Sequence, residues 1–298
     1  MASRRQYGQE KSALFKPSTR PSLPGMTDIT EWRAGVGKAW AQSWQLTDRS
    51  FAGLTSRFLD MVHALPGQTI LDIGCGAGEL SLALARKRID ARVIGVDVSP
   101  DLITAAQQRA QGHPSVEFEL GNAAIWQRPG FTPDLLVSRH GVMFFDDPVR
   151  AFSHLAHISA KKARLAFTCF RAPQENAWIS GLAALITGGA PRVDPLAPGP
   201  FAFADSQRVS AILTAAGWSG VRIEPLDFAY VAGSGADAVS DARAFFTRIG
   251  PLAAVLRAAE GQAREDLYLR LDHWLGQNCR DGLVAFPAAA WQVTARKG

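Results

Sequence analysis

From Thr69 onward, short runs of apolar and β-branched residues alternate with longer segments whose apolar residues recur at helical spacing. This alternation predicts successive strand–helix units and a parallel sheet. The helices are expected at about Gly78 to Lys87, Ser99 to Gln111 and Pro148 to Ser159. The first strands are expected at Thr69 to Ile73, Arg92 to Val96, Val116 to Leu120, Asp134 to Ser138 and Ala163 to Phe170.

The second half of the chain predicts two more strands and a helical insertion. A helix at Ser206 to Ala216 ends before Gly217, and a strand at Val221 to Val231 follows. The stretch from Ala236 to Gln277 has helical periodicity and precedes a last strand at Leu283 to Ala295. We therefore expect an α/β protein with a doubly wound, seven-stranded, mostly parallel sheet and a helical cap insertion.

The N-terminal region predicts a leader followed by helix. Residues 1–25 are rich in Ser, Arg, Pro and Gln and lack the apolar stretch of a secretory signal, so we expect a disordered leader. A transit peptide is the alternative, because the segment carries arginines and a single acid. In the periodic segment that follows, Trp32, Trp40 and Trp44 are spaced 8 and 4 apart, which predicts one shared helical face.

Charge and cysteine content narrow the function classes. The net charge is +5, but residues 1–27 hold five basic residues and one acid, which leaves +1 for the remaining 271 residues. A nucleic-acid partner is therefore not expected. No apolar run approaches the length of a membrane span. The three cysteines are widely spaced, which predicts neither a zinc cluster nor a disulfide framework and favours a reducing, cytoplasmic location.

A glycine-rich turn between the first expected strand and helix is the strongest chemical signal. Gly74, Gly76 and Gly78 give the spacing G-x-G-x-G, and such a turn allows backbone to approach a ligand closely. The dinucleotide fingerprint instead requires a glycine at the position of Glu79. A pyrophosphate would meet an acid there, so a nicotinamide oxidoreductase is disfavoured.

Two further positions lie at the ends of the next strands. Asp97 ends the second strand, where an acid in doubly wound folds accepts hydrogen bonds from ribose hydroxyls. Asn122 and Ala123 follow the third strand, where an amide side chain and a backbone N–H can read an adenine edge. Together these positions favour an adenosine-containing ligand without a pyrophosphate.

Four motifs of the chain resemble those of a known enzyme family. Residues 68–230 contain Leu71 to Gly78, Gly95 to Ser99, Gly121 to Ala123 and Asp134 to Phe145. In these the chain resembles the class I S-adenosylmethionine-dependent methyltransferases, which have a Rossmann-like fold. The run from Ser138 to Pro148 also resembles bacterial small-molecule methyltransferases, distantly like the ubiquinone and menaquinone C-methyltransferases.

The resemblance implies S-adenosylmethionine as the cofactor and assigns a role to each matching position. Gly74, Cys75 and Gly76 would line its methionine portion, Asp72 would orient the amino end, and Asp97 would bind the ribose. Asn122 stands where the family often has an acid, and its amide oxygen can still accept a hydrogen bond from adenine. The further expected cofactor contacts are Val98, Ala123, Ser138 and Trp44.

Candidates for chemistry follow the fourth strand, at the edge of the sheet where ligands bind in this architecture. His140 is the candidate general base, because its unperturbed pKa lies near neutrality. The alternative is that His140 bonds a loop backbone or contacts the cofactor. Met143 and Phe144 are candidates for an apolar substrate wall, and Trp40 or Trp44 for a lid over the cofactor, with plain packing as the alternative for both. In the inserted segments, an apolar acceptor pocket could gain further aromatic side chains from Trp178, Trp274, Phe245 and Phe246. No metal site is expected.

The sequence thus predicts methyl transfer to an O, N or C atom of a small, rather apolar or aromatic metabolite. The alternative is a non-catalytic adenosylmethionine-binding or assembly protein of the same fold. Residues 26–66 are expected to form a helical lid, residues 67–232 and 281–298 the cofactor-binding domain, and residues 233–280 the cap. A homo-oligomer is compatible with the sequence.

Overall fold

The computed structural model describes residues 29–191 and 194–298. The expected leader, residues 1–25, lies outside the described residues. Three helices come first: α1 (Ile29–Arg33), α2 (Gly35–Gln42) and α3 (Trp44–His63). The sheet strands are β1 (Thr69–Ile73), β2 (Arg92–Asp97), β3 (Val116–Leu120), β4 (Leu135–Arg139), β5 (Arg164–Phe170), β6 (Trp218–Ser234), β7 (Cys279–Arg280) and β8 (Leu283–Lys297).

Helices connect the strands, as the periodicity predicts. The shorter connections are α4 (Glu79–Lys87), α5 (Pro100–Arg109), the 3-10 turn η1 (Gly141–Phe144), α6 (Pro148–Ile158), the 3-10 turn η2 (Pro173–Glu175), α7 (Ala177–Thr187) and α8 (Ser206–Ala215). Three helices separate β6 from β7: α9 (Ala238–Arg248), α10 (Pro251–Ala258) and α11 (Gly261–Gln277).

The strand order within the described residues is β3-β2-β1-β4-β5-β8-β6, with β7 paired to β8 outside this path. β1 to β5 pair in parallel, and β8 is antiparallel to both β5 and β6. The α/β, mostly parallel fold class is therefore confirmed, with the short β7 as an addition to the seven expected strands. The order reverses at β1, which places the switch point between β1 and β4, where such sheets bind ligands.

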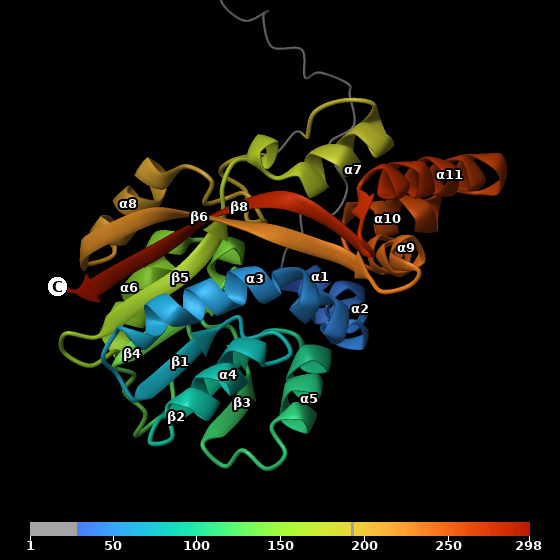
Figure 1. Ribbon diagram of the computed structural model, residues 1–298. Coiled ribbons are helices and arrows are strands. Elements are labelled where there is room, and N and C mark those ends of the chain that lie inside the picture. Colours follow the sequence, from blue (N-terminus) through green and yellow to red (C-terminus); the bar gives the residue numbers. More distant parts are fainter. Residues whose placement is uncertain (1–28, 192–193) are drawn as a thin grey trace, which may run out of the picture.

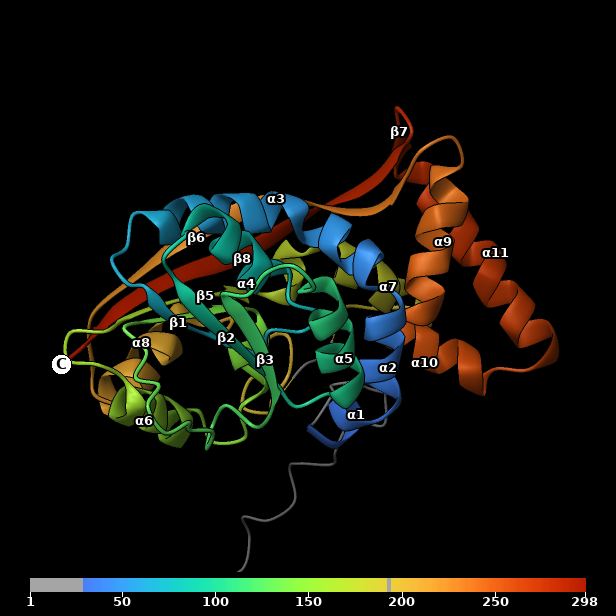
Figure 2. The ribbon, with the colours of Figure 1, turned by 90° about the horizontal axis from the view of Figure 1, so that it is seen from below.

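Both faces of the parallel strands are buried, because side chains alternate between two apolar cores. In β1, Ile70 belongs to one core and Leu71 to the other, and Val93 and Ile94 of β2 divide in the same way. This is typical of a sheet covered by helices on both sides. Figure 2 shows α3 above the sheet and α6 and α8 below it.

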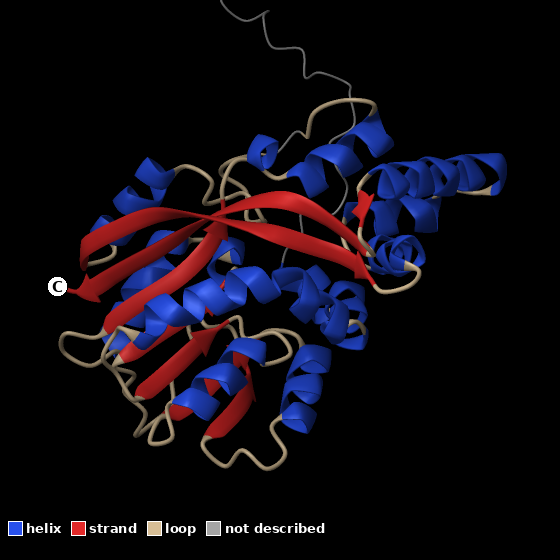
Figure 3. Ribbon diagram, viewed as in Figure 1, coloured by secondary structure: helices blue, strands red, loops and turns tan. Residues whose placement is uncertain are grey.

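β6 and β8 are long enough to leave the helix-covered sheet. They continue as a two-stranded ribbon toward α9, α10 and α11, which gather at one end of the molecule (Figures 1 and 3). The two-residue turn between β7 and β8 has positive φ at both Asp281 and Gly282, as a tight primed hairpin turn requires. No helix in the described part of the chain is long and apolar enough to cross a membrane.

The N-terminal helical segment is broken twice, so the expected shared face of three tryptophans is wrong. Ala34 leaves helical geometry at φ −115° and ψ −135°, and Ser43 separates α2 from α3. Trp32 and Trp40 still meet, with ring centroids 5.3 Å apart. Trp44 begins the next helix and stacks on the guanidinium of Arg109, 3.8 Å from its ring centre.

Helix α2 lies against the start of α5 because Gly37 has no side chain. A Cβ on Gly37 would meet Ser99 Oγ at 2.1 Å and the Trp32 carbonyl oxygen at 2.2 Å. We expect Gly37→Ala to weaken this packing by about 1–3 kcal/mol, as overpacking does. The free energy of urea unfolding and amide exchange across α2 measure the effect.

Gly35→Ala is the matched control, because a Cβ at Gly35 meets nothing within 4 Å. It should leave the packing intact and gain helix propensity. Equal stability and equal amide exchange in the two variants would contradict the close approach at Gly37.

Candidate functional site

A cavity of about 430 Å³ opens at the carboxyl ends of β1, β2 and β4. Its walls come from these strand ends, from α1 to α3, and from α7, α9 and α10. This volume is in the range of small-molecule sites. The predicted residues that line it are Trp40, Gly74, Gly76, Asp97, Val98, Asn122, Ala123, His140, Met143 and Phe144.

The glycine loop presents bare backbone to this cavity. The N–H of Gly74 donates to the Val96 carbonyl over 2.8 Å, which holds the loop against β2. A Cβ on Gly74 would approach Gly141 Cα to 2.8 Å, so only glycine fits there. Gly76, at φ 55°, lines the cavity, and a Cβ there would meet nothing within 4 Å. The loop therefore leaves room beside its backbone for a ligand.

The Asp97 carboxylate is buried at the end of β2. Its Oδ2 accepts from the N–H of Gly76 and its Oδ1 from the N–H of Ser99, each over 2.9 Å. Burial raises the pKa of Asp97, and the backbone N–H groups of Ser99, Gly76 and Val98 oppose that rise. Each carboxylate oxygen retains a lone pair. Since Asp97 lines the cavity, it can accept hydrogen bonds from a pair of hydroxyls.

Asn122 lines the cavity with part of its hydrogen-bonding capacity used. Its Oδ1 accepts from the N–H of Ala124 over 3.0 Å, which makes a local turn after β3. Close packing continues at Gly121, where a Cβ would meet the Trp126 ring at 2.9 Å. The amide oxygen has one further lone pair, and the amide N–H₂ remains as a donor.

Four predicted cofactor contacts do not line the cavity. Asp72 faces α4, where its Oδ2 accepts from Ser81 Oγ over 2.6 Å, and burial raises its pKa to about 6. Ser138 Oγ donates to the Ile73 carbonyl and accepts from Gly141 N–H, so it joins the ends of β1 and β4. The Cys75 thiol is buried in the loop, with a raised pKa. Trp44 packs on Arg109, as described above.

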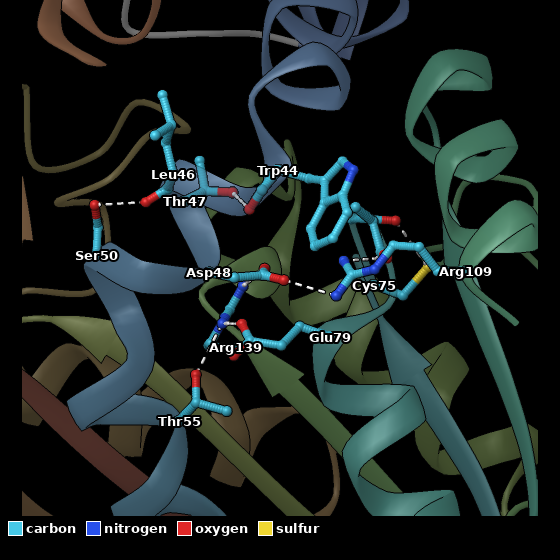
Figure 4. A network of polar contacts seen from close by, with 12 residues as sticks. Trp44, Leu46, Thr47, Asp48, Ser50, Thr55, Cys75, Glu79, Arg109 and Arg139 are labelled. Carbon is cyan, nitrogen blue, oxygen red and sulfur yellow. Dashed lines mark hydrogen bonds and ion pairs between the residues drawn. The ribbon is translucent and has the colours of Figure 1, made fainter. Parts of the chain in front are cut away.

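Asp48 and Arg139, two of the charged residues that line the cavity, were not among the site residues expected from the sequence. Asp48 Oδ2 accepts from Arg109 over 2.7 Å, and its Oδ1 lies 3.9 Å from Arg139 Nη2 (Figure 4). Arg139 also bonds Thr55 Oγ1 over 2.8 Å and pairs with Glu79. Burial raises the pKa of Asp48, while both arginines oppose the rise. The network ties α3 to β4, α4 and α5.

His140 sits at the end of β4 in the left-handed region, at φ 68°, which is strained for a side-chain-bearing residue. Its N–H donates to the Thr168 carbonyl, and its Nδ1 lies 3.0 Å from Thr168 Oγ1. Burial, reinforced by Arg139, lowers its pKa to about 3. Its Nε2 has no hydrogen-bond partner among the described residues. The imidazole is therefore neutral near pH 7.

Aromatic rings surround His140 and form the other half of the cavity. The imidazole lies 4.2 Å from the Phe170 ring and 5.4 Å from the Phe51 ring, centroid to centroid. Trp178 stacks on Tyr230 at 5.0 Å. We call these rings and their neighbours the aromatic chamber: Phe51, Phe170, Trp178, Phe201, Tyr230, Phe245 and Phe246, all of which line the cavity.

The predicted substrate wall is only partly exposed to the cavity. Met143 is buried, and its Sδ accepts from the N–H of Phe170 over 3.4 Å. Phe144 meets Trp32 edge to face at 5.3 Å, which joins the wall to the N-terminal helices. Trp178 on α7 and Phe245 and Phe246 on α9 line the cavity, whereas Trp274, the fourth aromatic residue expected at an acceptor pocket, does not. Tyr230 on β6 was not expected as a site residue, because its strand is predicted as ordinary core. Among the described residues, no cluster of His, Cys, Asp or Glu could hold a metal ion.

Comparisons with known proteins agree with this geometry. Residues 70–162 match the family described as a methyltransferase domain. Phosphoethanolamine N-methyltransferase 3 of Arabidopsis thaliana is 35% identical over 99 residues, 33% of this chain and 20% of that protein. The chain thus spans about a fifth of the length of the first curated relatives it matches.

A bacterial relative and a solved structure extend the similarity. The aklanonic acid methyltransferase DauC of Streptomyces sp. (strain C5) is 30% identical over 146 residues, 47% of this chain and 66% of that protein. A phosphoethanolamine N-methyltransferase 2 of Haemonchus contortus, solved with phosphomonomethylethanolamine and S-adenosylhomocysteine, aligns with a TM-score of 0.51. The alignment covers 87% of this chain and 56% of that one at 15% identity, which indicates a shared fold.

The low pKa of His140 gives a direct prediction. In NMR titrations of the ring protons, assigned by comparison with His140→Gln, the His140 signal should not move between pH 8 and 5. A midpoint near 6.5, the value of an unperturbed histidine, would contradict its burial as a neutral group.

The lowered pKa of His140 also makes the stability of the fold depend on pH. Because the folded pKa lies below the unfolded value, the unfolded chain binds more protons between about pH 3 and 6.5, and stability falls as the pH drops through that range. His140→Gln should reduce this fall in the free energy of unfolding.

Proposed function

We propose that this chain, which carries a methyltransferase domain of the class I Rossmann-like fold, transfers a methyl group from S-adenosylmethionine to a small apolar or aromatic acceptor. One observation carries the proposal. One cavity is lined at one side by Gly76 and by Asp97, an acid at a strand end suited to ribose hydroxyls, and at the other side by the aromatic rings around His140. A cofactor and an acceptor thus have adjoining places, as a direct transfer requires.

The residues around the glycine loop fit the cofactor. The bare backbone at Gly74 and Gly76 would lie beside the methionine portion, and Asp97 would accept hydrogen bonds from the ribose hydroxyls. Val98, Asn122 and Ala123 would border the adenine. When bound, the cofactor would supply a methyl group attached to a positively charged sulfur: the acceptor's nucleophile would attack the methyl carbon, and the carbon–sulfur bond would break with its electron pair passing to the sulfur.

Asp48 and Arg139 add opposite charges to the same half of the cavity. The carboxylate of Asp48 suits the amino group of the methionine portion, and the guanidinium of Arg139 suits its carboxylate. Arg109 and Glu79 balance the two side chains from behind. The proposed ligand contacts therefore add no unpaired charge to this part of the protein.

The lining of the chamber supports an aromatic acceptor. Flat rings of Phe51, Phe170, Trp178 and Tyr230 offer offset and edge-to-face contacts to another ring. The name of DauC gives aklanonic acid as its substrate, and those of the plant relatives give phosphoethanolamine. A phosphorylated acceptor would need a group of cations, and the chamber's described lining is mainly aromatic. The bacterial relative is therefore the better guide.

His140 is proposed to hydrogen-bond the acceptor's nucleophilic atom. Its neutral ring has an unpartnered Nε2 and borders the chamber, so it can orient a hydroxyl or amine toward the cofactor. A pKa of about 3 makes it a weak resting base. The main contribution of His140 is therefore to position the acceptor, and the acceptor's proton passes on to water.

We further propose that Trp32 and Trp40, on α1 and α2, cover the cavity as a lid.

The cofactor half is tested by Asp97→Ala. Loss of the carboxylate removes the ribose contact and frees the Gly76 N–H, so the Kd of S-adenosylhomocysteine, measured by calorimetry, should rise tenfold or more, about 1.4 kcal/mol. Asp101→Ala, which removes a half-buried acid in the first turn of α5 that does not line the cavity, is the control. A folded wild type that binds neither S-adenosylmethionine nor S-adenosylhomocysteine would refute the proposal.

The proposed acceptor site is tested by placing a large side chain in the aromatic chamber. Ala254 on α10 lines the cavity, whereas Ala258 on the same helix is exposed and does not. Ala254→Trp should lower kcat/KM for an aromatic acceptor at least tenfold and leave the Kd of S-adenosylmethionine within twofold. The acceptor comes from a panel of hydroxylated aromatic compounds scored by S-adenosylhomocysteine formation.

Ala258→Trp should leave both quantities unchanged. Unaltered turnover in Ala254→Trp would place the acceptor elsewhere. Cofactor binding by the wild type without turnover of any compound in the panel would favour the alternative of a binding protein.

A further inference from the structure

A second cavity, of about 350 Å³, lies at the opposite end of the sheet from the proposed active site. Three arginines line it: Arg164 at the start of β5, Arg222 near the start of β6 and Arg296 near the end of β8. The other lining residues carry no charge: Leu65, Gly220, Thr294 and Ala295. All the charge on the wall of this cavity is therefore positive.

The sheet register places the three arginines next to one another on one face of the sheet. Arg164 and Arg296 are direct partners across the antiparallel pair β5 and β8. Arg222 is the partner of Thr294, two residues before Arg296, so it lies diagonally from Arg296 on the same face. Directly opposite side chains have Cβ atoms about 5 Å apart, and like charges there destabilise a sheet.

No carboxylate in the described part of the chain forms an ion pair with any of the three. The salt bridges within 4.0 Å use other arginines. The nearest acid along β6, Glu224, accepts from Gln292. Arg296 makes one long bond, 3.4 Å from its Nε to Ser219 Oγ. The Nε of Arg164 is buried without a partner.

The backbone at this end also favours an open site. The pairing of β6 with β8 shifts register between Ser219 and Arg222, which bulges the strand. Gly220, within the bulge, has φ 59°, and a Cβ there would come within 3.4 Å of Arg296 Nε. The positive φ favours glycine at this position of the bulge, and the bulge lies beside the Arg296 side chain.

We propose that Arg164, Arg222 and Arg296 form a binding site for a phosphate group. Three guanidinium forks on three adjacent strands match the several oxygens of a phosphate, and arginine binds such groups with paired hydrogen bonds. A bound dianion also removes the repulsion between Arg164 and Arg296. The phosphate belongs either to a soluble molecule or to an acidic lipid headgroup. The site is independent of the methyl transfer proposed above.

Inorganic pyrophosphate is the probe for the soluble source. Calorimetry at low ionic strength, with S-adenosylhomocysteine at saturation to occupy the other cavity, should detect its binding to the wild type. Arg222→Gln and Arg296→Gln should each raise the Kd at least tenfold. Arg150→Gln, which removes an exposed arginine from α6, should leave the Kd within twofold.

The lipid source is tested by flotation with phosphatidylglycerol vesicles, with phosphatidylcholine vesicles as the reference. Binding to the anionic vesicles that Arg222→Gln abolishes and Arg150→Gln retains supports the site with a headgroup as its ligand. Binding of neither pyrophosphate nor anionic vesicles by the wild type overturns the proposal. So does binding that Arg150→Gln weakens as much as Arg222→Gln does.

Thermal unfolding separates a ligand site from a structural role. Without ligand, Arg296→Gln should unfold at the wild-type temperature or above it, because a like-charge pair is removed. Pyrophosphate should raise the unfolding temperature of the wild type and not that of the variant. A ligand-free variant that unfolds at a lower temperature would show that Arg296 stabilises the fold, and would overturn the proposal.

Discussion

The proposed active site depends on the buried carboxylate of Asp97. It ends β2 and accepts the N–H groups of Gly76, in the loop after β1, and of Ser99, at the start of α5. A buried carboxylate without such donors would be costly. The glycine loop supplies one of these donors, the N–H of Gly76, in the conformation that brings its backbone to the cavity. The same contacts that satisfy the charge therefore fix the shape of the site.

The remaining walls are held to this loop by ion pairs that cross the fold. Asp48 on α3 reaches Arg109 on α5 and approaches Arg139 on β4, and Arg139 pairs with Glu79 at the start of α4. Helix α3 also carries Phe51, three residues after Asp48, into the aromatic chamber. A charge network thus sets the distance between the strand ends, where the cofactor is proposed to bind, and the rings proposed to hold the acceptor.

Local patterns predicted the parts of this arrangement that depend on adjacent residues. The strand, glycine turn and helix around Gly74 and Gly76 follow from spacing, as does Asp97 at a strand end. Trp44 does not line the cavity. The expectation that it would do so assumed one continuous helix, and breaks at Ala34 and Ser43 interrupt that helix. Asp48 and Tyr230 were missed because their neighbours come from segments far away in the chain, which periodicity does not pair.

The long antiparallel strands give the molecule two separate ends. β6 and β8 run along one edge of the sheet and extend beyond it, so the residues at their two ends have different surroundings. Toward α9, β6 brings Tyr230 to the aromatic chamber, where its ring packs against the rings of Trp178 and Phe245. Toward the start of β5, the same pair of strands aligns Arg222 and Arg296 beside Arg164, where nothing in the described chain balances the charge. A parallel partner in place of β8 would not oppose Arg296 to Arg164 in this register, so the reversal of this one strand creates the arginine cluster.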